Sequence, residues 1–200
     1  MPCGYVLKLL GATATGDSVC VNVFGVKRYF YAQAPPAVKV DFVLQQALRC
    51  GMGRSSGAFW IQQETKKLLT QYDPHTHPVF KITLTSDLEF NTAVSALREC
   101  GCHIFEADVT VTSRFMIDNG FTPFGWYTCS EAIPRTLYRD SHTALEFDCA
   151  LHTLTVHLGR TDWPRYRALS FDIECLGDEG FPTAVRESDM IIQISCILWT

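Results

Sequence analysis

The chain has 200 residues, of which 47% are hydrophobic and 19% are charged, a composition that argues against extended disorder and allows a packed core. Lys and Arg number 17 against 21 Asp and Glu. The net charge of −4 therefore gives no general electrostatic basis for nucleic-acid binding, although it leaves room for a local basic patch. The nine cysteines are odd in number and no secretory signal precedes them, which indicates mostly reduced, buried thiols in a cytosolic or nuclear protein.

The first half of the chain alternates strand and helix patterns. In chain order, the patterns predict two or three strands over 5–33, a helix over 39–51, a strand over 77–87, a helix over 87–101, a strand over 103–109 and a short helix over 112–120. Ser86 or Asp87 is expected to cap the second helix, and Gly120 to end the third. Residues 59–73 fit neither pattern. The order over 5–110 predicts an α+β domain in which helices cover one sheet, in part like ferredoxin or RNA-recognition folds.

The second half is rich in strands. Residues 145–159 alternate strongly, Trp163-Pro164 interrupts the pattern, and strands are predicted over 168–177 and 190–200 around a polar loop. We therefore expect a domain over 1–165 and the beginning of another over 166–200. A strand as apolar as the last one needs cover on both faces, which a hairpin alone does not supply, so the chain is expected to end within a domain. Its apolar run is far too short to span a bilayer.

The strand over 168–177 contains two acids, Asp172 and Glu174, separated by a single Ile. Residues at i and i+2 of a strand point to the same face, so both carboxylates project together. Carboxylates so placed can hold one or two Mg²⁺ or Mn²⁺ ions, and two such ions activate water and stabilise the leaving oxygen in phosphodiester cleavage. The alternative is an edge strand whose acids face solvent and discourage pairing with other strands. The spacing alone favours this alternative, and the apolar neighbours bring the two hypotheses close to even.

A family resemblance adds to this pattern. The stretch "ALSFDIECLGDEGFPTAVRESDMIIQISCILW" resembles the first exonuclease motif of family B DNA polymerases, most closely the herpesvirus type. Upstream, "FEADVTVTSRFMIDNGFTPFGWY" at 105–127 is similar to a second segment of the same family. The two matches occur in the family's order, and residues 1–75 match only loosely. In that family the first motif lies on the first strand of a ribonuclease-H-like domain.

The resemblance implies a partial chain of a viral DNA-directed DNA polymerase with metal-dependent 3′-to-5′ proofreading. Asp172 and Glu174 would be the catalytic, metal-binding acids of a two-metal Mg²⁺ or Mn²⁺ site that residues outside this chain complete. The implied partners are a DNA primer-template with its single-stranded 3′ end, deoxynucleoside triphosphates and a viral processivity subunit, in the host cell nucleus and without a membrane. The later exonuclease acids and the paired aspartates of the polymerase site are missing, so the 200-residue chain is expected to be inactive.

Two other functions stay open. One is a non-catalytic nucleic-acid-binding module, suggested by "VKRYFYAQ" at 26–33, where basic and aromatic residues interleave as in base-stacking sheets. Its glycine and aromatic spacing fits that signature poorly, and core packing is the preferred interpretation. The other is a free-standing exonuclease, which the two-strand length of the second domain disfavours. Downstream sequence with further acids would identify the polymerase.

Several smaller motifs each allow a functional and a structural interpretation. His75 and His77 in "DPHTHP", and "CGCH" with Cys100, Cys102 and His103, suggest zinc but lack a second half at the required spacing, so loop and packing roles are preferred. In "FMID" a packing role is expected, with Phe115, Met116 and Ile117 forming an apolar plug. Arg165 and Arg167, with Arg160, lie close to the acids in sequence, where they could contact a nucleic-acid backbone or simply solvate a linker.

Overall fold

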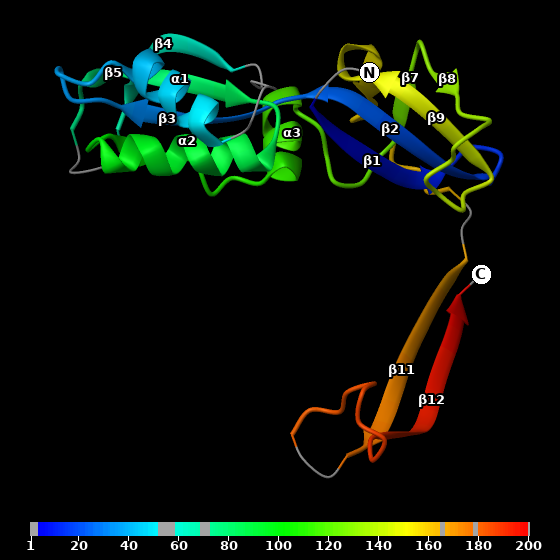
Figure 1. Cartoon of the computed structure of the whole chain (residues 1–200). Coiled ribbons are helices and arrows are strands. Elements are labelled where there is room, and N and C mark those ends of the chain that lie inside the picture. The colour runs from blue at the N-terminus through cyan, green and yellow to red at the C-terminus, as the bar shows by residue number, and fades with distance from the viewer. Residues whose placement is uncertain (1–3, 52–58, 69–72, 165–166, 178–179, 200) are drawn as a thin grey trace.

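The computed structural model describes residues 4–51, 59–68, 73–164, 167–177 and 180–199. Its fold is mixed α/β and dominated by sheets, with two sheets side by side and a hairpin that extends away from them (Figure 1). Among the described helices, none has the length and apolar character that crossing a bilayer requires.

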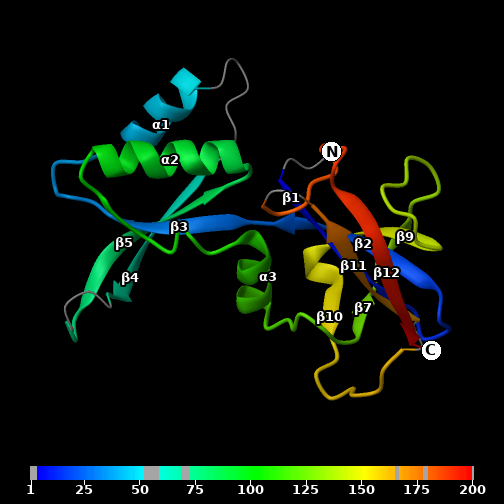
Figure 2. The ribbon, with the colours of Figure 1, turned by 90° about the horizontal axis from the view of Figure 1, so that it is seen from below.

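The helix-covered sheet has the strand order β4-β5-β3-β6, and all of its neighbouring strands are antiparallel. Its elements are, in chain order, β3 (Arg28–Gln33), α1 (Val40–Gly51), β4 (Trp60–Lys67), β5 (Thr76–Leu84), α2 (Asp87–Glu99) and β6 (His103–Phe105). Both helices lie on one face of the sheet (Figure 2). Phe30 and Ile82 from the strands meet Leu44, Phe90 and Leu97 from the helices in a fully buried core. The helices predicted over 39–51 and 87–101 and the strand predicted over 77–87 are therefore confirmed.

Helix ends follow the capping residues in the sequence. Ser86, one of the two predicted candidates, is the N-cap of α2, and its side chain accepts a hydrogen bond from the Glu89 backbone N–H at 3.3 Å. Gly120 ends α3 (Val111–Asn119) in the left-handed conformation with φ 64°, which a glycine adopts without steric cost. Both helix ends depend only on residues within a few positions, so the sequence could predict them.

The second sheet has the order β1-β2-β9-β8. It is built from β1 (Tyr5–Ala12), β2 (Ser18–Val26), β8 (Ile133–Pro134) and β9 (Leu145–Ala150). Only Lys27 separates β2 from β3, so one extended stretch of chain crosses both sheets (Figure 1). The sequence interpretation placed all strands over 5–110 in a single sheet, and this was wrong, because β2 pairs in parallel with β9, more than 120 residues away.

A second core lies between this sheet and the elements that follow the helix-covered sheet. These are α3, β7 (Tyr127–Cys129), a 3₁₀ turn (Leu151–Thr153) and β10 (Leu154–Val156). Val23, Phe115, Cys149 and Leu154 are buried there, and Met116 packs against them. Ile117 is 68% exposed and takes no part in the apolar plug that the sequence predicted. The plug consists of Phe115 and Met116, because the helix turns Ile117 away from the core.

Two strand predictions also change. The unassigned segment 59–73 contains β4, a regular edge strand of the helix-covered sheet. The strand predicted over 103–109 stops at Phe105, because Glu106 adopts φ 57° and breaks the extended chain. The Glu106 carboxylate there accepts a hydrogen bond from Arg114 Nη2 at 2.8 Å. Arg114 is 5% exposed, and its burial could not be read from the helical pattern.

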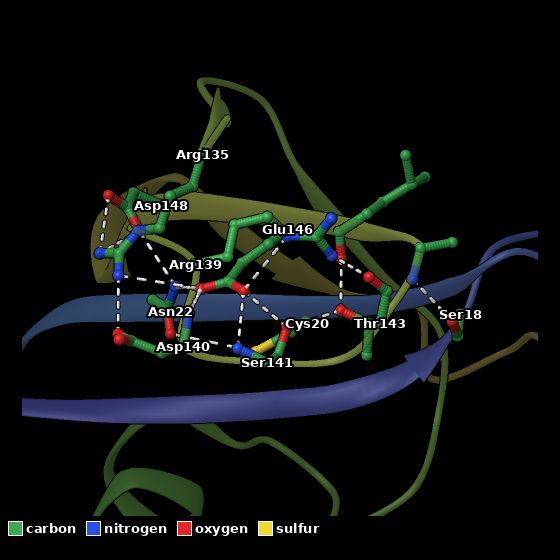
Figure 3. A network of polar contacts seen from close by, with 12 residues as sticks. Ser18, Cys20, Asn22, Arg135, Arg139, Asp140, Ser141, Thr143, Glu146 and Asp148 are labelled. Atoms are coloured by element: carbon green, nitrogen blue, oxygen red, sulfur yellow. Dashed lines mark hydrogen bonds and ion pairs between the residues drawn. The ribbon is translucent and has the colours of Figure 1, made fainter. Parts of the chain in front are cut away.

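A polar network fastens the loop before β9 to β2 (Figure 3). Glu146 is buried, and its two oxygens accept hydrogen bonds from Asn22 Nδ2 at 3.0 Å and from Ser141 Oγ at 2.6 Å. Asn22 also donates to Asp148, which in turn accepts from Arg135 Nη2 at 3.0 Å. The hydrogen bonds that Glu146 accepts, first from the Ser141 hydroxyl and then from Asn22 and the backbone N–H groups of Asp140 and Ser141, lower its pKa to about 2, although burial raises it.

Candidate functional site

The two acids lie on the terminal hairpin, formed by β11 (Ala168–Leu176) and β12 (Met190–Trp199). The strands are antiparallel, as expected for runs rich in β-branched and aromatic residues on either side of a polar loop. In the described part of the chain, β11 and β12 pair only with each other, and every residue of both strands is exposed. The predicted strands are confirmed.

The register of the hairpin separates a polar face from an apolar one. Asp172 lies opposite Ser195, and Glu174 lies opposite Gln193, so four polar side chains share one face. The other face is apolar throughout its centre, where the paired residues are Leu169 with Leu198, Phe171 with Cys196 and Ile173 with Ile194. The acids therefore project together, as the i, i+2 spacing requires, away from a face suited to a core.

Few polar contacts involve the carboxylates of Asp172 and Glu174 in the described part of the chain. Asp172 Oδ1 accepts a hydrogen bond from the Ile173 backbone N–H at 3.0 Å. No Lys, Arg or His among the described residues forms an ion pair with Asp172 or Glu174. Two like charges held close together without a compensating cation raise the free energy of the site, and a divalent cation would lower it.

The donor set fits Mg²⁺ or Mn²⁺, both of which prefer oxygen ligands and take one or two protein carboxylates together with water or substrate oxygens. Asp172 and Glu174 offer carboxylate oxygens on one face. Over the ranges that the structure describes, no group of three or more His, Cys, Asp or Glu side chains is placed to hold a metal ion. The hairpin thus supplies part of such a site.

The loop between the strands is fastened by Asp189. Its Oδ2 accepts hydrogen bonds from the Thr183 backbone N–H at 2.6 Å and from Arg186 Nε at 2.8 Å. Arg186 Nη2 also donates to the Phe181 carbonyl oxygen at 2.7 Å. The side chain of Asp189 is 3% exposed, so the polar loop that the sequence predicted is an organised turn in its described part.

The arginines near the acids differ from one another. Arg160 forms a bidentate pair with Asp162, at 2.7 and 2.8 Å, and its guanidinium lies 3.6 Å from the centre of the Trp126 ring. Arg167 is exposed and directly precedes β11. Arg165 lies outside the described residues. The structure therefore leaves Arg167 as a basic side chain near the base of the hairpin.

The zinc-like motifs have other partners. Asp73 accepts from both histidines of the H-x-H motif, with 2.7 Å to His75 Nδ1 and 2.7 Å to His77 Nε2, and the hydrogen bonds of His75 lower the pKa of Asp73. Cys102 is buried in the core under the helices, where burial raises the pKa of its thiol, whereas Cys100 is exposed at the end of α2. Both motifs serve local structure here.

The aromatic residues of 26–33 mainly pack. Phe30 is fully buried and meets Phe90 edge to face at 5.1 Å between ring centres. Tyr29 is 8% exposed, its hydroxyl donates to Asp118 at 2.8 Å, and Arg114 covers its ring at 4.0 Å. Burial, followed by the hydrogen bond to Asp118, raises the pKa of Tyr29. A ring covered in this way cannot stack on a base.

The fold and this hairpin define a class of protein. Residues 102–200 match the family model described as DNA polymerase family B, exonuclease domain, a region that runs from β6 to the end of the terminal hairpin. The fold is similar to that of the family B DNA polymerase from the hyperthermophilic archaeon Pyrobaculum calidifontis, with a TM-score of 0.68 and 18% identity, over 96% of this chain and 23% of that one. The chain belongs to the family B DNA polymerases.

Within that family the chain is of the herpesvirus type. It is 52% identical over 200 residues to the DNA polymerase catalytic subunit of Human herpesvirus 8 type P (isolate GK18), and 49% identical over 199 residues to that of Saimiriine herpesvirus 2 (strain 11). It is 47% identical over 204 residues to the same subunit of Epstein-Barr virus (strain B95-8). Each match covers 100% of this chain and 20% of the relative, so the chain spans about a fifth of the length of these curated relatives.

Proposed function

We propose that this segment belongs to a DNA-directed DNA polymerase that replicates a viral genome and removes mismatched nucleotides with a 3′-to-5′ exonuclease. The observation that carries the proposal is the pair of carboxylates of Asp172 and Glu174, which share the polar face of the terminal hairpin and have no ion-pair partner among the described residues. The match of residues 102–200 to a family B exonuclease domain supports it independently.

In this proposal Asp172 and Glu174 hold Mg²⁺ or Mn²⁺ together with acids from outside this chain, as in a ribonuclease-H-like domain. The ions supply activation of a water molecule and stabilisation of the leaving oxygen. Because both carboxylates project from one face of the hairpin, they approach a metal ion from the same side. The apolar face packs against the rest of the domain, and this packing excludes water from the side of the hairpin opposite the acids. The 200-residue chain alone is expected to be inactive, because two carboxylates leave most metal positions unfilled.

The partners follow from the same proposal. The substrates are a DNA primer-template, its single-stranded 3′ end and deoxynucleoside triphosphates, and a viral processivity subunit assists the complete protein in the host cell nucleus. We also propose that Arg167, which is exposed directly before β11, and Arg165 contact the DNA backbone. We further propose that the polymerase amino-terminal domain covers 1–165 and that the exonuclease domain begins at 166.

The element order β-α-β-β-α-β and the strand order of the helix-covered sheet support a ferredoxin-like topology for that part of the chain. A nucleic-acid-binding module on its open face is the alternative function. The burial of Tyr29 beneath Arg114 weighs against that alternative. We retain the polymerase segment as the proposed function.

The test uses the complete polymerase that contains this segment. Asp172→Ala and Glu174→Ala are each expected to lower exonuclease activity on single-stranded DNA at least a hundredfold, because metal catalysis depends on ligand geometry. Primer extension is expected to continue with more errors. Ser170→Ala is the matched control, since Ser170 lies on the same face of β11 and opposite Ile197.

Three outcomes are distinguishable. Loss of exonuclease activity with intact primer extension supports the proposal. Retained exonuclease activity in both variants would make the acids a solvent-facing strand feature and would contradict it. Equal loss of both activities would show that the acids belong to a different site from the one proposed.

A further inference from the structure

The motif "IQIS" on β12, residues 192–195, has no assigned role in the proposed function. Its two polar residues lie directly opposite the two acids: Ser195 is opposite Asp172, and Gln193 is opposite Glu174. Directly opposed residues of antiparallel strands have Cβ atoms about 4.5–5.5 Å apart, which brings their side chains within reach of each other. The polar pair is therefore placed beside the proposed metal ligands by register.

The two side chains are already ordered relative to each other. Gln193 Nε2 donates a hydrogen bond to Ser195 Oγ at 3.0 Å. A hydroxyl that accepts in this way still has its own proton to donate. Within the described residues no acceptor for that proton is seen, and the residue directly opposite Ser195 in the strand register is Asp172.

The Asp172 carboxylate can also accept further hydrogen bonds or bind a cation. Oδ1 accepts the Ile173 backbone N–H, which fixes one oxygen of the group and leaves Oδ2 for other partners. Outside this cluster, the same face carries Ala168 and Ser170 with Ile197 and Trp199, and Leu176 with Met190 beyond the register shift, so polar side chains on β12 occur only opposite the acids. Just beyond Gln193 the register shifts between Glu174 and Cys175, and such bulges re-aim side chains beside active sites.

We propose that Ser195, oriented by Gln193, is a positioning residue for the metal-binding carboxylate of Asp172. The Gln193 carboxamide donates to the Ser195 hydroxyl, which donates to Asp172 and fixes the direction in which the remaining carboxylate lone pairs meet a divalent cation. This inference rests on the proposed function, since it requires that Asp172 bind a metal ion. Partners of this kind orient metal ligands and are commonly worth ten- to a hundredfold in metal affinity.

The experiment measures Mn²⁺ binding to the complete polymerase by electron paramagnetic resonance, with the difference from Asp172→Ala isolating this site. We expect Ser195→Ala and Gln193→Ala to weaken Mn²⁺ binding about tenfold. Ser195→Thr keeps the hydroxyl and is expected to bind within about twofold of the unaltered protein. Ser170→Ala, the same substitution on the same face but opposite Ile197, is expected to change nothing.

A second readout is the Mg²⁺ concentration that gives half-maximal exonuclease rate. It is expected to rise in Ser195→Ala and Gln193→Ala, while the rate at saturating Mg²⁺ recovers in large part. Mn²⁺ binding by both variants at the level of Ser170→Ala, with binding lost in Asp172→Ala, would overturn this inference and leave the proposed function standing. Normal Mn²⁺ binding by Asp172→Ala would overturn the proposed function, and this inference with it.

Discussion

Glu146 shows how a single charged residue acquires a role from its neighbours. Strand patterns treat it as one polar position in an alternating run, whereas the structure buries it between Asn22 and Ser141. Its pKa of about 2 means that the folded protein binds a proton at this group more weakly than the unfolded chain does, whose value is near 4.5. The carboxylate therefore stabilises the fold in its charged form.

The first prediction concerns this residue. Because the folded pKa of Glu146 is lowered, its contribution to stability is fully present above about pH 4.5 and is lost as the pH falls toward 2. Glu146→Gln is expected to lower the melting temperature of the chain at pH 7 by several degrees and to flatten its dependence on pH over that window. Thermal melts between pH 2 and 7 test this, with the exposed Glu131→Gln as control. An unchanged pH dependence in Glu146→Gln would contradict it.

At the scale of elements, the terminal hairpin depends on its loop as well as on its strands. Asp189 joins the Thr183 backbone to the Arg186 side chain and so closes a compact turn just before β12. The position of Asp189 also disfavours any larger residue at position 177, because a Cβ added to Gly177 would lie 2.8 Å from Asp189 Oδ1. The loop therefore helps to set where β12 begins and how it registers with β11.

The second prediction is that Asp189→Ala loosens this loop. The substitution leaves the Thr183 N–H and the Arg186 guanidinium without the carboxylate that binds both, a loss of about 1–3 kcal/mol for the local structure. Amide hydrogen exchange over the described loop residues is expected to quicken at least tenfold, while the core residues of α2 keep their protection. Glu187→Ala, an exposed acid in the same loop, is the control. Equal protection in Asp189→Ala and the control would count against the prediction.

At the scale of the molecule, the chain divides into a packed body and a hairpin with exposed strands. The third prediction is that limited proteolysis cuts between about 160 and 190 before it cuts within 78–120, because the latter range contains β5, α2 and their shared core. Mass spectrometry of early fragments locates the cuts. Early cleavage between Phe80 and Val109 would oppose a domain boundary near 165.

The fourth prediction concerns association. Phe171, Ile194 and Leu198 are each at least 57% exposed on the apolar face of the hairpin, a surface that normally packs against another element. The 200-residue chain is therefore expected to self-associate at micromolar concentration, and removal of 166–200 to restore a monomer. Analytical ultracentrifugation decides between the two. A monomeric 200-residue chain whose hairpin melts cooperatively would contradict the expectation.

The sequence by itself determined what depends on residues a few positions apart. It predicted Gly120 as a helix end, narrowed the N-cap of α2 to Ser86 or Asp87, and predicted the helices and most strands, because these follow from local hydrogen bonding and from the period of apolar positions. It also predicted that Asp172 and Glu174 share a face, because side chains two apart on a strand always do. The resemblance of two motifs was enough to indicate the family to which the chain belongs.

Tertiary structure decided everything that requires distant segments to meet. The parallel pairing of β2 with β9, the packing of Arg114 over the Tyr29 ring and the network around Glu146 join residues separated by up to 126 positions. No local pattern indicates such pairings, since the same alternation suits many partners. The position of Ser195 opposite Asp172 is of this kind as well: it depends on the register of two strands, and a shift of one residue would turn Ser195 to the apolar face.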